Sequence, residues 1–216
     1  MLTTASACAT LNGARPLEPG QHEIGATLGG PFFEFAGAAI PAPNIVLEGR
    51  SGLVRLVDRP LDINYGTNLT AFPFGIIQLH VGTSWLLVHQ DDTIPAVSWT
   101  QRFWFATNAL GSGYKSGDDI IDAWGAWQLE FTASWEFDHQ LLYLSLAQYL
   151  DFGNPELTLT PAIGAQFDFF EPGGVRLQVE LRWYAVNQPV ELTTLSWWPG
   201  GAGAFGVSVG VSHAFW

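Results

Sequence analysis

Two features of this sequence have the chemical character needed for hydrolysis: a histidine near a serine, and adjacent carboxylates. His80 and Ser84 lie on the same face of a stretch with two-residue alternation. Four residues along a strand span about 13 Å, so these side chains cannot form a nucleophile–base pair with each other. Any cross-strand partners of either are not identified by the sequence. Asp91-Asp92 and Asp118-Asp119 have the simpler interpretation of solvated loop carboxylates.

A glycine pattern typical of dinucleotide-binding sites occurs at Gly201, Gly203 and Gly206. Such a pattern binds phosphate where it lies between a strand and the N-terminus of a helix. Here a strand-like stretch follows it, which favours a flexible loop. We therefore predict no cofactor, no metal site and no enzymatic activity.

A larger set of ionisable residues lies on the polar faces of alternating segments. It comprises Arg102, Glu130, Glu136, Asp168, Arg176, Glu180 and Arg182. Asp168 and Arg176 flank the short stretch "EPGG" and are expected to face each other across a hairpin. Isolated charges in a narrow interior are costly, whereas paired charges are tolerated. We predict a lumen closed by ion pairs; the alternatives are a wet passage lined by the same residues and a catalytic role for them.

The composition indicates what kind of protein carries these residues. Charged residues make up 13% of the 216 residues, about half of the usual ~25%, while aromatic residues reach 14%. With 24 glycines and 13 prolines, this is typical of strands and turns. The net charge of −12 leaves no basic patch for nucleic acid. No apolar run is long enough for a transmembrane helix, but a membrane-spanning strand needs only about 9–11 alternating residues.

Ten segments show the two-residue alternation of strands that have one apolar and one polar face. They cover residues 21–30, 44–56, 61–69, 75–88, 96–108, 127–137, 141–152, 157–169, 175–184 and 205–216. The segment 141–152 is apolar on both faces, so its orientation is not determined. Most connections alternate between short turns and longer loops, as in an up-and-down membrane barrel.

Aromatic residues on the apolar faces form two bands. Trp85, Trp99, Trp135, Phe137, Phe169 and Phe215 lie toward the short turns, and Trp183 and Phe205 lie toward the opposite ends of the strands. Two membrane interfaces would select this distribution. Bulky apolar side chains on nearly every strand are also too many to fill one narrow lumen. The apolar faces are therefore predicted to face lipid; the alternative is a soluble sandwich with an aromatic core.

The closing segment, "FGVSVGVSHAFW" from Phe205 to Trp216, alternates strictly and ends on aromatic residues. With it, residues 20–216 resemble bacterial outer-membrane β-barrel proteins of the small, eight- to ten-stranded type. The resemblance implies an all-β fold: a single antiparallel up-and-down transmembrane barrel of about ten strands in the bacterial outer membrane. It also implies contact with membrane lipid and recognition of the last strand by the outer-membrane assembly machinery. Trp216 departs from the pattern because it lies one step out of register with Phe215.

Residues 1–20 precede the first alternating segment and are predicted to form a flexible tether, with the barrel spanning 21–216. Cys8 is the only cysteine, so no intramolecular disulfide forms. Ala5-Ser6-Ala7-Cys8 resembles the end of a bacterial lipoprotein signal, which implies lipidation of Cys8. The seven residues before it are too few for a whole signal peptide, so the alternative is an incidental cysteine.

These observations favour a non-enzymatic membrane component that is structural, or that docks a protein partner through its outer loops or N-terminal tether. Trp197 and Trp198 are candidate contacts for protein or lipid in an outer loop, with the aromatic belt as the alternative. A narrow channel for small solutes or ions is the second hypothesis, and a barrel enzyme acting on lipid or peptide is the third. At the level of protein class, the alternative is a soluble lipocalin-like binder of an apolar ligand. A barrel protease resembling the omptins is disfavoured, since no histidine accompanies Asp118 and Asp119 at the outer rim.

Overall fold

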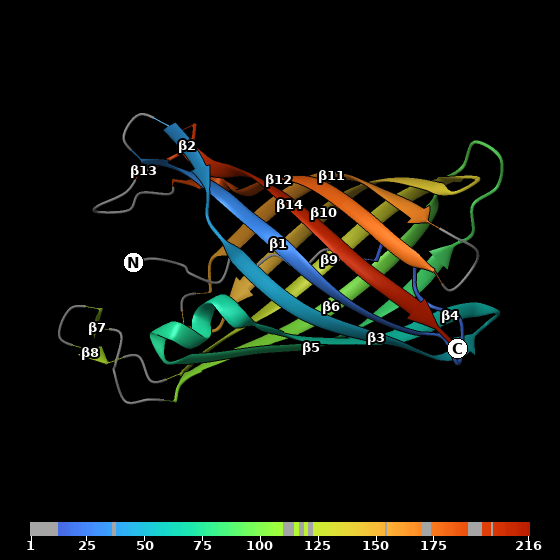
Figure 1. The fold of residues 1–216 in the computed structure, drawn as a ribbon, viewed down its shortest axis with the longest axis horizontal. Helices are drawn as coiled ribbons and strands as arrows, with labels where there is room; N and C mark the ends of the chain where they lie inside the picture. Colours follow the sequence, from blue (N-terminus) through green and yellow to red (C-terminus); the bar gives the residue numbers. More distant parts are fainter. Residues whose placement is uncertain are drawn as a thin grey trace.

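Ten long antiparallel strands close into a barrel (Figure 1). The computed structural model describes residues 13–35, 38–109, 115–116, 119–120, 123–153, 155–169, 174–189, 196–199 and 201–216. The barrel strands are β1 (His22–Phe35), β3 (Asn44–Leu56), β4 (Arg59–Asn68), β5 (Ile76–Val88), β6 (Ala96–Asn108), β9 (Ala123–Phe137), β10 (Gln140–Asp151), β11 (Leu157–Phe169), β12 (Val175–Pro189) and β14 (Ala202–Phe215). Each pairs with the next of the ten, and β1 closes the ring by pairing with both β3 and β14. The predicted all-β, ten-stranded, up-and-down fold is confirmed.

The alternation in sequence becomes an alternation between lumen and exterior. It also settles the orientation of β10, which is apolar on both faces. Leu142 and Leu144 point outward and are about half exposed, whereas Leu141 and Tyr143 are buried on the inner face. The inner face is apolar at the start of β10 because Leu141 and Tyr143 pack against Ala14 of the N-terminal segment.

The two ends of the barrel differ. The turns at residues 57–58, 89–95 and 138–139 lie at one end, here called the short-turn end. The opposite, long-loop end carries β2 (Ala38–Pro41), η2 (Leu69–Phe74), β7 (Lys115–Ser116), β8 (Asp119–Ile120) and β13 (Ser196–Trp197). Both β2 and β13 pair with the last residues of β1, which extends the sheet beyond the barrel wall (Figure 1).

Among the residues that the structure describes, no helix is long and apolar enough to cross a membrane.

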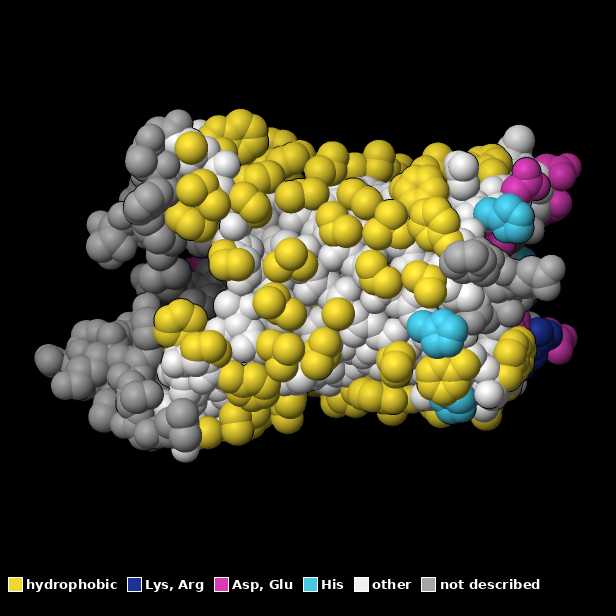
Figure 2. Space-filling view, viewed as in Figure 1, with side chains coloured by type: hydrophobic (Ala, Val, Ile, Leu, Met, Phe, Trp, Pro, Cys, Tyr) yellow, Lys and Arg dark blue, Asp and Glu magenta, His cyan; other side chains and the backbone are white. Residues whose placement is uncertain are grey.

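The barrel exterior is covered with apolar side chains (Figure 2). Leu28, Ile163 and Val211, on three different strands, are each more than half exposed. Charged and histidine side chains gather instead at the short-turn end of the visible face (Figure 2). An apolar surface of this extent is a liability in water but is the expected surface for contact with lipid.

The predicted aromatic bands lie on this exterior. Toward the short-turn end, Trp85 on β5 pairs with Trp99 on the adjacent strand β6. The Trp135 indole donates a hydrogen bond to the Thr93 carbonyl. Three phenylalanines of this band are exposed: Phe137, Phe169 and Phe215. Toward the long-loop end, the rings of Trp183 and Phe205 lie 6.5 Å apart in an edge arrangement. The role of these residues at membrane interfaces stays a prediction.

The N-terminal segment differs from the expected flexible tether where the structure describes it. Ala14 and Leu17 are only 1% and 3% exposed, because residues 13–18 lie within the barrel at the short-turn end. Gly20 and Gln21 then pair with the backbone of Gly52 and lead into β1. The physical reason is that the lumen supplies partners for the backbone and side chains of this segment, as described below.

Candidate functional site: the charged lumen

All seven predicted charges occupy inward-facing positions on their strands. Arg102, Glu130, Glu180 and Arg182 are at most 2% exposed, whereas Glu136, Asp168 and Arg176 lie nearer the short-turn end and are more accessible. The lumen thus contains a buried central group of charges and a wetter group at one mouth.

The most fully bonded central pair is Glu180 with Arg182, two residues apart on β12. Two guanidinium nitrogens lie 2.6 and 2.7 Å from Oε1 of Glu180. The other carboxylate oxygen accepts a hydrogen bond from the Tyr143 hydroxyl at 2.8 Å, and Gln178 donates to that hydroxyl at 2.7 Å. Arg182 also donates to the Tyr149 hydroxyl at 3.4 Å. These contacts supply the partners that ions need when they are removed from water.

The second central pair, Arg102 with Glu130, is looser. Nη1 of Arg102 lies 3.8 Å from Oε2 of Glu130. Arg102 donates through Nε to Asn64 at 2.9 Å, and Gln128 donates to Glu130 at 2.8 Å while accepting from the Trp104 indole. Within the described part of the chain, Nη1 of Arg102 and Oε1 of Glu130 have no hydrogen-bond partner. Because buried polar atoms are nearly always bonded, we expect ordered water at these two atoms.

Glycines on neighbouring strands make room for the largest inward side chains. Gly82 pairs with Arg102, and a Cβ at Gly82 would lie 2.1 Å from the Gln101 carbonyl oxygen and 2.7 Å from Cγ of that arginine. Gly164 pairs with Tyr143, and a Cβ there would lie 2.1 Å from the tyrosine ring. The arginine and the tyrosine therefore lie against the barrel wall at places where any larger residue would displace them.

Sequence reasoning missed several charges that complete the group at the short-turn end. Arg50 forms a 2.6 Å ion pair with Asp62 and lies 3.8 Å from Glu23. Glu23 also pairs at 2.6 Å with Arg176, whose expected partner Asp168 is 3.2 Å away. Asp62 and Glu23 stand on the polar faces of alternating segments, so the same pattern that selected the other charges was available to find them.

Arg15 connects two distant walls of the lumen. Its carbonyl accepts a hydrogen bond from Arg50 on β3 at 2.6 Å. Its guanidinium donates to Ser134 at 3.1 Å and pairs with Glu136, both on β9. In the order β3-β4-β5-β6-β9 these strands are four steps apart in a ring of ten, so they face each other across the barrel.

The neighbours of Arg15 are held as firmly. The Leu17 amide donates to Asp62 at 2.9 Å, and the Ser98 hydroxyl donates to the Ala14 carbonyl at 3.0 Å. A Cβ on Gly13 would lie 1.5 Å from the Arg50 guanidinium, so a larger residue here would have to displace the group that pairs with Asp62. Residues 13–18 therefore obstruct the lumen at the short-turn end.

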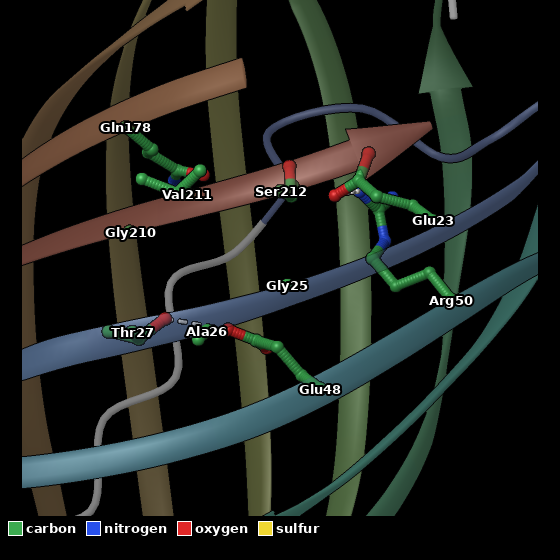
Figure 3. Close-up of a pocket in the computed structure, with 11 residues that line it drawn as sticks. Glu23, Gly25, Ala26, Thr27, Glu48, Arg50, Gln178, Gly210, Val211 and Ser212 are labelled. Atoms are coloured by element: carbon green, nitrogen blue, oxygen red, sulfur yellow. Dashed lines mark hydrogen bonds and ion pairs between the residues drawn. The ribbon is translucent and has the colours of Figure 1, made fainter. Parts of the chain in front are cut away.

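Two polar cavities adjoin this obstruction. The smaller, about 20 Å³, lies between β1, β3, β12 and β14, and Figure 3 shows Glu23, Glu48 and Arg50 on its walls. Thr27 donates to Glu48 there at 2.9 Å (Figure 3). Such a space accommodates about one water molecule. The larger cavity, about 170 Å³, is lined by Arg15 among others and lies at the short-turn end.

The residues first considered for hydrolysis do not assemble. His80 packs its ring 4.6 Å from that of Trp104, while the Ser84 hydroxyl accepts hydrogen bonds from Asn64 and Thr100. Asp91 and Asp92 are exposed in a turn, and Asp118 lies outside the described residues. In the described part of the chain, no three His, Cys, Asp or Glu residues are grouped so as to hold a metal ion.

The long-loop end carries an exposed aromatic cluster. Trp198 is 44% exposed and makes edge contacts with Phe32 at 6.1 Å and Phe205 at 6.3 Å between ring centroids. Trp197 pairs with Phe33 through the β13 backbone. The predicted lipidation site, Cys8, lies outside the described residues.

No protein-family model matches this sequence, and no curated protein matches it either. The fold is similar to that of an outer membrane channel from Pseudomonas putida F1, with a TM-score of 0.53 and 8% identity, covering 96% of this chain and 100% of that chain. The translocator domain of the autotransporter NalP from Neisseria meningitidis has a TM-score of 0.44 and 10% identity, covering 92% of this chain and 90% of that one.

The likeness to the Pseudomonas channel concerns the fold, and it agrees with the apolar exterior. The chain is a transmembrane β-barrel of the bacterial outer-membrane type. This agrees with the location predicted from the sequence.

Proposed function

We propose that the protein is a non-enzymatic component of the outer membrane whose lumen is closed by paired charges and by residues 13–18. The observation that carries this proposal is the link from Arg50 through Arg15 to Glu136, which joins facing walls of the barrel. A lumen crossed in this way conducts poorly. Its work is then done at its surfaces rather than through its interior.

The long-loop end is the surface that we assign to a protein partner. Aromatic residues that remain exposed beside a sheet edge are typical of binding hot spots. Trp198 is such a residue, and the neighbouring strand β2 is exposed along its whole length. At the other end, exposed Phe215 closes β14, and we propose this strand as the element that the assembly machinery recognises.

Conductance in a planar lipid bilayer tests the closed lumen. The wild-type protein is expected to insert without a steady conductance above the bare bilayer. Heat-modifiable migration on a denaturing gel confirms that the same preparation is folded. A steady conductance from folded wild-type protein would contradict the closed barrel and favour a channel.

A narrow channel is the second candidate, favoured by the way in which large inward side chains lie against the wall over Gly82 and Gly164. In this candidate, residues 13–18 are the removable obstruction. Arg15→Ala removes the ion pair to Glu136 and the hydrogen bond to Ser134. Conductance that appears in Arg15→Ala and is absent in wild type would support a gated channel, whereas silence in both supports the permanently closed barrel.

A further inference from the structure

A groove of about 860 Å³ runs along the outer wall over β12, β14, β1, β3, β4 and β5, with the exposed His213 among its lining residues. Its floor includes the small outward-facing Ala26 of β1, which pairs with Leu47. Gly49 of β3 also faces outward, but the ring of its partner Tyr65 covers it. Leu47, Tyr65 and Leu79 rise on its sides and are each more than 40% exposed. On the face that carries β1 and β3, Figure 2 shows white surface, which is backbone or small and polar side chains, between the apolar side chains.

The size and lining of the groove suit a hydrocarbon chain. Its volume lies within the roughly 300–1,000 Å³ of sites that bind small molecules. Its outward-facing lining is mostly aliphatic or aromatic, and it belongs to the surface that contacts lipid. An acyl chain fills such a depression without the loss of hydrogen bonds that water would suffer there.

A cationic side chain, that of Arg59, lies on the same outward face of β4, on the short-turn side of the groove. Alternation places Arg59, Leu61, Ile63 and Tyr65 on the outward side, with Arg59 at the short-turn end. The six residue steps from Tyr65 to Arg59 span about 20 Å along a strand, or about 14 Å of depth at a tilt of about 45°, close to half of a hydrocarbon core of about 30 Å. Arg59 therefore stands near the level of a headgroup when an acyl chain occupies the groove.

The charges at and beside Arg59 determine which lipid headgroup would be complementary to this part of the surface. Arg55 is already paired with Glu18 at 2.7 Å, whereas Arg59 has no ion pair within the described part of the chain. Asp58, directly before it, is exposed in the turn. A phosphate beside Arg59 and an ammonium group beside Asp58 would each meet the opposite charge.

We propose that this groove binds one acyl chain of a phosphatidylethanolamine, whose phosphate contacts Arg59 and whose ammonium group contacts Asp58. Short turns of outer-membrane barrels face the periplasm, so the lipid belongs to the inner leaflet. The site is separate from the lumen, and it does not depend on whether the lumen conducts.

Native mass spectrometry of the intact protein in a phosphate-free detergent, titrated with phosphatidylethanolamine, tests the site. Wild type is expected to retain one lipid. Ala26→Leu fills the groove floor and is expected to weaken retention about tenfold, as a misfitted apolar pocket does. Arg59→Gln removes a charge-assisted hydrogen bond and is also expected to weaken retention about tenfold.

Two matched controls separate this site from general lipid contact. Ala165→Leu makes the same change on the outward face of β11, and Arg55→Gln removes the neighbouring arginine that is already paired. Both are expected to retain lipid as wild type does, and heat-modifiable migration verifies that every variant is folded. Absence of a one-to-one adduct, equal retention by test and control variants, or stronger retention of phosphatidylglycerol would each overturn the proposal.

Discussion

Arg50 and Asp62 form an ion pair inside the barrel, with 2.6 Å between Nη2 and Oδ2. The side chain of Asp62 has no exposed surface, and that of Arg50 is 7% exposed. The same guanidinium nitrogen donates to the carbonyl of Arg15. One cation therefore neutralises a buried carboxylate of the wall and also holds the segment that crosses the lumen.

Arg50→Gln is expected to destabilise the barrel and to loosen its N-terminal segment. Removing one member of a buried pair leaves an uncompensated charge, which typically costs about 3–5 kcal/mol. Urea unfolding of the refolded protein, followed by tryptophan fluorescence, measures the change in free energy of unfolding. Arg55→Gln is the control, because its pair with Glu18 is exposed and is expected to contribute less than about 1 kcal/mol. Equal losses in the two variants would refute the assignment.

The pair Glu180 and Arg182 allows a test in which charge is removed from both sides. Glu180→Leu leaves the buried guanidinium without its carboxylate and is expected to cost about 3–5 kcal/mol. The double variant Glu180→Leu/Arg182→Met is expected to recover most of that loss, since neither charge then remains buried. The same urea titration provides the comparison. A double variant less stable than the single one would show that the pair is not the origin of the effect.

Gly164→Ala is expected to disturb the lumen through Tyr143. The new methyl group would overlap the tyrosine ring, whose hydroxyl bonds to Glu180 and Gln178. Displacing the ring breaks these bonds, at a cost of about 1–3 kcal/mol. Gly153→Ala, in an exposed loop where the nearest atom is 3.4 Å away, is the control and is expected to change stability by less than about 0.5 kcal/mol.

A double-mutant cycle shows whether the Gly164→Ala effect acts through the tyrosine. With Tyr143→Ala in place, Gly164→Ala no longer meets a ring and should lose most of its cost. Additive losses in the double variant would mean that the glycine is needed for another reason.

The features that sequence reasoning predicted are local ones. Two-residue alternation depends only on which face of a strand meets lipid, so the ten strands and the inward position of Arg102 and Glu130 follow from the pattern itself. The facing of Asp168 and Arg176 follows from one short hairpin connection. None of these needs knowledge of how distant strands are aligned.

The features that it missed depend on distant register. Arg15 and its partner Glu136 are 121 residues apart in the sequence. The Pro- and Gly-containing N-terminal stretch has the composition of a flexible tether, and this composition is the same whether the stretch is in solvent or inside the lumen. The room that Gly164 leaves for Tyr143 is visible only once β10 and β11 are paired. The same holds for β10, whose inner apolar face has a partner only when Ala14 is inside the barrel.

Leu181→Arg tests what covers the barrel wall. Leu181 faces outward on β12 between the inward Glu180 and Arg182, at mid-barrel, and is 42% exposed. In a bilayer, an arginine on the lipid face near the midplane costs about 2–4 kcal/mol, whereas an exposed surface position in water changes stability by only about 0.5 kcal/mol. Ile94→Arg, in a short turn and 55% exposed, is the control. Unfolding of both variants in lipid vesicles should therefore show a large loss for Leu181→Arg alone, and equal small effects would mean that water, not lipid, covers the wall.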